Sequence, residues 1–536
     1  MSRDSLHGLG RALRLLTLRL RLPALAWLVP LLLLTAAVPP SYADVYPDEA
    51  SRRAVLNLAD TSPGMVIFLG KLAHPGTLGQ LFAWETGAYL MWCAALATIL
   101  MTASATRRDE EAGLAELMRG AGAGRLVPFA APALWIGGFL AILSLGVGVI
   151  LTTEAFFVEE LSVAGAWVFA ALLLALSLAF EAITLVFAQL ARSAGTARGL
   201  GLAAFALFFA FRVLADQGGP AHLRWASPFA WRDLVDPYGG DHLLPIGFGS
   251  ACALLIGAGA ALLYERREMY EAYLPDSSSS TRRWRLAGPL DLLARLGRAH
   301  AGWWLIALVC LAALFSGMGD SISRLLEESP ESAAYVETIG GAGDLVAIYV
   351  LLIADFNVLL AIVAVVGRAV AMAGAEGAGL AEIVLVQGVS RTRDYFSRVA
   401  DSLLVAVLFL AAMALTSALV TATQFTAGSA VRRAWVYTAS QGFGMLAALG
   451  IAFALLGLVP RFASAAWAPV AWSGFAVFLG GLAGLPEWMA DLSVLGHVVE
   501  VERAAEWTPL IVQAAVGVLG ILIGWRGYLR RDVMAE

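Results

Sequence analysis

The sequence has little charge, and almost all of its basic residues are arginine. Charged residues make up 14% of the 536 positions, against roughly 25% in an average soluble domain. Lys71 is the one lysine in the chain, and Leu72 follows it. A Walker A loop requires Gly-Lys-Ser/Thr, because its lysine contacts the nucleotide phosphates. The chain is therefore not a P-loop ATPase, and any ATP and Mg²⁺ are expected in a different polypeptide.

Cysteine and histidine are also scarce. The three cysteines (Cys93, Cys252 and Cys310) and the six histidines are scattered, without zinc-ligand spacing, an H-E-x-x-H motif or a G-x-S-x-G elbow. We therefore predict no catalytic residue, no metal site and no cofactor in this chain, which excludes an enzyme. The net charge is −5 and gives no reason to expect nucleic-acid binding.

Long apolar blocks take the place of the missing charge. Hydrophobic residues make up 60% of the chain, and the mean hydropathy is +0.76. A block of about 20 apolar residues crosses a bilayer as a helix, and lipid offers no partner for a free backbone group. We predict an all-α polytopic membrane protein with twelve transmembrane helices. They lie near 22–38, 83–103, 127–152, 164–191, 199–214, 244–263, 301–319, 345–366, 397–424, 434–458, 463–484 and 508–525.

The distribution of basic residues predicts the orientation. With a cytoplasmic N-terminus, the inside segments hold 26 Lys/Arg and the outside segments hold 10, as the positive-inside rule requires. Both termini are thus expected in the cytoplasm. The alternative for the first apolar block is a cleaved signal peptide. Against it, Arg295 and Arg298 precede the block at 301 in the same way, and both basic segments fit helices lying on the membrane surface.

One polar segment occurs twice. Residues 110–116 read Glu-Glu-Ala-Gly-Leu-Ala-Glu and residues 376–382 read Glu-Gly-Ala-Gly-Leu-Ala-Glu, each followed nine residues later by an arginine. Each residue of the first copy is separated from its match in the second copy by the same number of positions, about half of the chain. Each half also ends in a basic pair, Arg266-Arg267 or Arg530-Arg531. We predict two parallel six-helix repeats. Their ranges are 1–270, which begins with a surface helix, and 285–536, and a polar cytoplasmic linker, 271–284, joins them.

The repeated segment is predicted to be a short helix that docks a partner, because alanine, leucine and glutamate favour helix and glycine permits close approach. A solvated loop that only fixes topology is the alternative. The docking residues are Glu110, Glu111, Gly113, Glu116, Arg125, Glu376, Gly379, Glu382 and Arg391.

Four polar residues lie inside predicted spans: Glu181, Asp355, Asn357 and Gln441. A charge at the bilayer centre is costly, so it normally faces protein or water. These residues are candidates for a substrate cavity. The open alternative is that each is protonated or hydrogen-bonded and only fixes helix packing.

The segment resembles a known family. Two acidic residues and a glycine at three-residue spacing, directly after the second of six spans and closed by a basic residue, are similar to the permeases of ABC-2 type exporters. Thr106–Gly113, Leu485–Ser493 and Glu506–Leu510 resemble a fused twelve-span subgroup, the antibiotic or polyketide (tetronasin-like) exporters. The second copy departs from this pattern, because Gly374 and Ala375 stand where the first has Arg108 and Asp109.

The resemblance implies a permease subunit in the bacterial cell membrane. It would export a hydrophobic or amphiphilic compound, such as an antibiotic, through a cavity between the halves. Two copies of a P-loop ATPase would dock on the repeated segments. The alternative is a proton-driven twelve-helix secondary drug transporter with Glu181 and Asp355 as proton carriers, although loop 104–126 lacks the Gly-x-x-x-Asp-Arg-x-Gly-Arg-Arg pattern of such transporters. A membrane protein that senses or inserts lipids is the third reading.

Overall fold

The computed structural model is helical throughout the residues that it describes, with no strand among them. Those residues are 3–45, 52–53, 55–56, 59, 63–158, 160–268, 271–274, 286–317, 319, 345–377, 379–424, 428–479, 486–499 and 507–531. The chain divides into two compact units, Met1–Thr281 and Arg282–Glu536. Most of the predicted linker (275–284), together with Ala378, Leu485 and Glu506 of the predicted motifs, lies outside the described residues.

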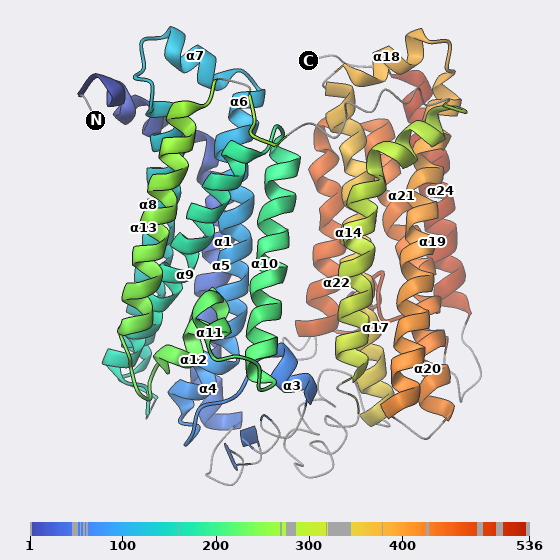
Figure 1. The fold of residues 1–536 in the computed structure, drawn as a ribbon. Helices are drawn as coiled ribbons and strands as arrows, with labels where there is room; N and C mark the ends of the chain where they lie inside the picture. Colours follow the sequence, from blue (N-terminus) through green and yellow to red (C-terminus); the bar gives the residue numbers. More distant parts are fainter. Residues whose placement is uncertain are drawn as a thin grey trace. The chain divides into compact units, whose positions relative to one another are not determined.

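Among its described residues, unit 1 contains six helical segments long and apolar enough to cross a membrane; Figure 1 shows their arrangement. They are α1 (Leu9–Val45), the run Leu78–Glu111 that begins with α4 (Leu78–Trp84), α8 (Val127–Glu154), α9 (Val163–Leu190), α10 (Ala194–Asp216) and α13 (Leu244–Arg266). Helix α9 packs against α5 (Thr86–Ala103), α8, α10 and α13, so it forms the centre of the unit. Short helices α3 (Pro63–Phe68), α11 (His222–Ala226) and α12 (Trp231–Val235) lie at one end.

Unit 2 contains five such segments among its described residues. They are α14 (Pro289–Gly317), α17 (Leu345–Gly377), α19 (Arg391–Gln424), α20 (Gly428–Ser440) continued by α21 (Gly442–Leu458), and α24 (Thr508–Arg530). The span predicted at 463–484 appears instead as a 3₁₀ segment, Pro460–Trp467, followed by the 12-residue helix α22 (Ala468–Leu479). Helix α23 (Glu487–Ala490) follows it. Twelve spans in two repeats therefore stay a prediction.

The basic segments before the first span of each unit are continuous with the span that follows them. Helix α1 runs without a break from Leu9 into the apolar span, and α14 does the same from Pro289. Leucine, arginine and alanine dominate both junctions, and all three propagate a helix well. That these basic segments lie on the membrane surface stays a prediction.

Helices α21 and α24 pack closely along a row of glycines. Gly450 and Gly457 of α21 lie against Gly517 and Gly524 of α24, and a Cβ atom added at any of them would overlap the opposite backbone or a leucine side chain packed beside it. Small residues allow two membrane helices to approach to backbone contact. Helix α21 forms the centre of unit 2 together with α17.

Candidate functional site

The first repeated segment closes the second span of unit 1 with an irregular turn. Helix α5 passes into a π-helical turn, Ser104–Arg108, and then into α6 (Asp109–Glu111). Gly113 has φ 75° and starts the seven-residue helix α7 (Leu114–Gly120). A left-handed residue favours glycine, because a Cβ atom there costs roughly 1–2 kcal/mol. The glycine thus sets the angle between span and helix.

The second repeated segment has the same backbone. Helix α17 ends at Gly377, and Gly379 with φ 71° starts the seven-residue helix α18 (Leu380–Val386). A second left-handed glycine follows each helix, Gly122 with φ 85° and Gly388 with φ 80°. Both glycine pairs keep the offset of the sequence repeat. The duplication is therefore one of backbone geometry as well as of sequence.

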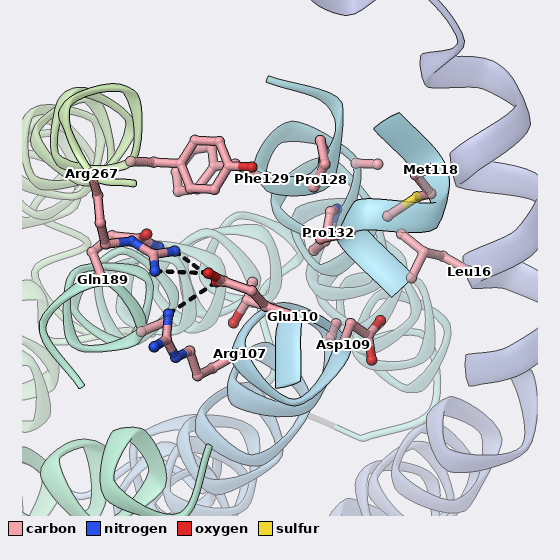
Figure 2. A pocket seen from close by; sticks show the side chains of 16 residues that line it. Leu16, Arg107, Asp109, Glu110, Met118, Pro128, Phe129, Pro132, Gln189 and Arg267 are labelled. Atoms are coloured by element: carbon pink, nitrogen blue, oxygen red, sulfur yellow. Dashed lines mark hydrogen bonds and ion pairs between the residues drawn. The ribbon is translucent and has the colours of Figure 1, made fainter. Parts of the chain in front are cut away.

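Glu110 lies in a buried ion cluster at the α7 end of unit 1 (Figure 2). Both terminal amino groups of Arg267 donate to its carboxylate, at 2.8 and 2.6 Å, and Arg107 donates at 3.0 Å. Both arginines also donate to the Glu271 carbonyl oxygen, and Arg107 donates to that of Arg192. The residues after α13 are therefore fastened to the end of the second span.

Glu376 forms the matching contact in unit 2. Arg531, which follows α24, donates to both oxygens of its carboxylate, at 3.0 and 2.7 Å. The same guanidinium donates to the carbonyl oxygens of Gly457 and Leu456, at the end of α21. Glu376 is 4% exposed. In each unit a buried carboxylate thus joins the end of the second span to the end of the last one.

The two matched arginines reinforce this junction. Arg125 donates to the Glu265 carbonyl oxygen at 2.5 Å, and Arg391 donates to the Arg531 carbonyl oxygen at 2.6 Å. Each acceptor lies at the carboxyl end of the last span of its own unit, where cations are favoured. We refer to these contacts as the clamp. It consists of Glu110, Arg125 and Arg267 with Arg107 in unit 1, and of Glu376, Arg391 and Arg531 in unit 2.

The predicted docking residues therefore separate into two groups. Glu110 and Glu376 are buried in the clamp, and Glu111 is exposed but accepts a hydrogen bond from the Ala194 amide at 3.0 Å. Glu116 on α7 and Glu382 on α18 are exposed. Large apolar side chains accompany them: Leu117 is 68% exposed on α7, and Leu380, Ile383 and Val386 are 54%, 62% and 82% exposed on α18. The side chains of this second group are exposed on α7 and α18.

The predicted cavity residues are divided between the two units. In unit 2, Asp355 accepts hydrogen bonds from the Gln441 side chain and from the Gly496 amide, and Asn357 donates to Ile353 of its own helix at 2.9 Å. In unit 1, Glu181 is 4% exposed, and its Oε1 has no hydrogen-bond partner among the described residues. Asp355 and Gln441 join α17 to the break between α20 and α21, which fits a packing role.

Sequence reasoning does not find the partners of the two glutamates. Arg267 and Arg531 stand out only as members of a basic pair that ends each half. The spacing from Arg267 to Arg531 differs from the spacing from Glu110 to Glu376, so register alone does not pair them. Arg107 carries no signal, since residue 373, its match in the second half, is alanine.

Two comparisons place the chain among known proteins. A family profile described as "Multidrug efflux system permease Rv1217c, C-terminal domain" matches residues 286–529. The multidrug efflux system permease protein Rv1217c of Mycobacterium tuberculosis (strain ATCC 25618 / H37Rv) is 27% identical over 539 residues, which covers 98% of this chain and 96% of the relative. The similarity thus extends over both units. Together with the eleven candidate spans among the described residues, it identifies a multi-pass protein of the bacterial cell membrane.

Proposed function

We propose that this chain is the membrane-spanning permease subunit of an ATP-binding cassette exporter. It moves a hydrophobic or amphiphilic compound out of the cell, and a separate ATPase subunit hydrolyses the ATP. The full-length similarity to a multidrug efflux permease supports this proposal, and so does the lack of a lysine that could serve a P-loop.

One observation carries the proposal: each unit presents a short helix on a left-handed glycine and fastens the base of that helix to its last span through the clamp. A pull on α7 or α18 is therefore transmitted to two spans at once. We propose that each helix receives one ATPase copy, two in all, at the cytoplasmic face. ATP and Mg²⁺ bind in those partners.

The finer assignment is also a proposal. The passages Thr106–Gly113 and Pro486–Ser493 support the tetronasin-like subgroup, and an antibiotic is then the substrate class. The proton-driven alternative is not favoured. Asp355, one of its two proton carriers, accepts hydrogen bonds from the Gln441 side chain and from the Gly496 amide.

The test is co-purification of the permease with the ATPase encoded beside it. A Glu110→Arg, Glu376→Arg variant is unsuitable, because both residues are buried in the clamp. We instead choose Leu117→Asp with Ile383→Asp, on the exposed faces of α7 and α18. We expect loss of the ATPase and loss of compound-stimulated ATP hydrolysis, with an unchanged unfolding temperature.

The matched control is Leu492→Asp, an equally exposed leucine (65%) in the loop before α24, at the opposite end of unit 2. It should leave ATPase binding intact. Normal ATPase binding and transport by the Leu117, Ile383 double variant would show that α7 and α18 do not dock the motor.

A further inference from the structure

Unit 2 has an open groove near its α18 end. It has a cavity volume of about 410 Å³, and α14, α17 and α19 form its walls. Leu293, Leu296, Met372 and Phe453 give it a largely apolar lining, and His300, Arg368, Arg398 and Asp401 supply its polar groups. Its size falls within the range of small-molecule pockets, roughly 300–1,000 Å³.

The two arginines of the groove differ in how many of their N–H groups have hydrogen-bond partners. Arg368 donates to both oxygens of Asp401, at 2.5 and 2.8 Å, so its charge is matched. Arg398 uses only its Nε, which donates to Asp394 at 3.0 Å. Among the described residues its two terminal amino groups have no partner, although its side chain is only 11% exposed. Asp394 also accepts a hydrogen bond from the Tyr528 hydroxyl.

The depth of the groove matches the boundary between hydrocarbon and headgroups. Helix α17 has 33 residues, so it is about 50 Å long and exceeds a ~30 Å hydrocarbon core by about 20 Å. Arg368 lies nine residues before its end at Gly377, and Arg398 lies seven residues after the start of α19. These offsets correspond to about 10–14 Å. Both guanidinium groups therefore lie near the level where lipid phosphates begin.

The wall formed by α14 carries exposed apolar side chains, as the surface of a span that faces lipid does. Leu296, Trp303 and Ile306 are 74%, 62% and 55% exposed along it. Arg295 and Arg298 lie in the same helix, before its apolar part. Lipid is the most concentrated potential ligand for a groove that opens on such a surface.

Unit 1 has no counterpart of these charges. At the offset of the repeat, the positions that match Arg368, Arg398 and Asp401 are occupied by Thr102, Pro132 and Trp135. Trp135 there stacks on Phe139 and donates to Thr17 of α1. Unit 1 has its own pocket between α1, the end of the second span and α8, and its charged groups are those of the clamp and Asp109. The arrangement of Arg368, Arg398 and Asp401 therefore has no match at the repeat offset in unit 1.

We infer that this groove binds the phosphate headgroup and upper acyl chains of an anionic phospholipid. The terminal amino groups of Arg398 hold the phosphate, as in charge-assisted arginine–phosphate contacts. Basic pockets between membrane helices at the cytoplasmic side recognise anionic headgroups in this way. The bound lipid fills the space between α14 and α19 and stabilises unit 2.

The test uses the full-length permease, delipidated in detergent. Native mass spectrometry counts the retained lipid, and thermal unfolding is measured with added phosphatidylglycerol, phosphatidylcholine or inorganic phosphate. We expect phosphatidylglycerol to bind and raise the unfolding temperature, and the other two to have little effect. Arg398→Gln should weaken phosphatidylglycerol binding about tenfold, the loss expected for one charge-assisted hydrogen bond.

Two further variants keep the inference falsifiable. Ala371→Phe narrows the groove without changing charge and should also lose the lipid, whereas Arg530→Gln removes an exposed arginine at the same end of unit 2 and should keep it. Equal binding of phosphatidylcholine, or equal losses in the Arg398 and Arg530 variants, would overturn a specific headgroup site. Displacement of the lipid by the exported compound with direct binding of that compound in the groove would assign it to the substrate instead.

Discussion

The α7 end of unit 1 and the α18 end of unit 2 share a skeleton but differ in surface. Both have left-handed glycines at matched positions and a buried glutamate that is bonded to an arginine after the last span. On the exposed face, Gly120 of α7 corresponds to Val386 of α18, and Arg119 corresponds to Leu385. Helix α18 thus presents a continuous apolar stripe, whereas α7 presents a mixed one.

This difference distinguishes the residues that stabilise the helix bundle from the exposed residues that a partner would contact. The clamp is kept in both units because removing one member of a buried ion pair leaves an uncompensated charge. The exposed faces carry no such penalty and have diverged. Two copies of one ATPase would therefore meet two non-equivalent surfaces, and the stronger contact is expected at α18.

The largest expected effect concerns the clamp. Removing one partner of a buried ion pair costs about 3–5 kcal/mol, so Glu376→Gln and Glu110→Gln should both lower the unfolding temperature strongly. Glu110→Gln should cost more, because it leaves two buried arginines without a counter-charge, Arg107 and Arg267, instead of Arg531 alone. Thermal unfolding of the purified variants measures both changes.

Charge exchange sharpens the comparison between the two clamps. The double variant Glu376→Arg, Arg531→Glu restores an opposite-charge pair and should recover much of the lost stability. Glu110→Arg, Arg267→Glu should recover less, because Arg107 then faces a second cation. Equal recovery in the two units would mean that Arg107 contributes nothing to the first clamp.

A smaller effect is expected from the glycine row between α21 and α24 of unit 2. Gly524→Val would force a side chain against the Phe453 backbone, and overpacking of this kind costs roughly 1–3 kcal/mol. The control is Gly259→Val in α13 of unit 1, where nothing lies within 4 Å of an added Cβ. Yield of monodisperse protein and unfolding temperature should fall for the first variant only. A similar decrease in yield and unfolding temperature for both variants would contradict the difference in helix packing between the units.

The smallest expected effect tests the two docking faces separately. An aliphatic side chain buried at an interface contributes about 1.5 kcal/mol or more. Ile383→Ser with Val386→Ser should therefore weaken ATPase binding about tenfold more than Leu117→Ser does. Titration of the ATPase onto immobilised permease measures this ratio. If Leu117→Ser weakens ATPase binding more, then α7 makes the stronger contact with the ATPase.

The repeat, most span positions and the start of each short helix can be predicted from the sequence, because hydropathy and register are local signals. The role of the matched glutamates cannot. The sequence predicts that Glu110 and Glu376 face a partner, but the fold brings each to an arginine 157 or 155 residues away. The sequence of a repeated charged residue in a loop does not show whether its side chain contacts a partner protein or another residue of its own chain.

The first span and the eleventh illustrate two other limits. A change from basic to apolar residues suggests a helix boundary near residue 22, but α1 continues through it and even through Pro23. The block at 463–484 is apolar throughout, yet its first residues form a 3₁₀ segment after Pro460. Hydropathy describes solvent preference and does not describe backbone geometry.

The glycine row between α21 and α24 has a mechanical consequence. Two helices that touch backbone to backbone cannot slide past each other without collision of their main chains, so the pair behaves as a single rigid rod. Arg531 fastens α17 to this rod at its tip. A force on α18 would accordingly tilt α21 and α24 together in unit 2. In unit 1, α13 packs on α9 through side chains, because Gly257 of α13 meets only the Cβ atom of Ala182, at 4.0 Å.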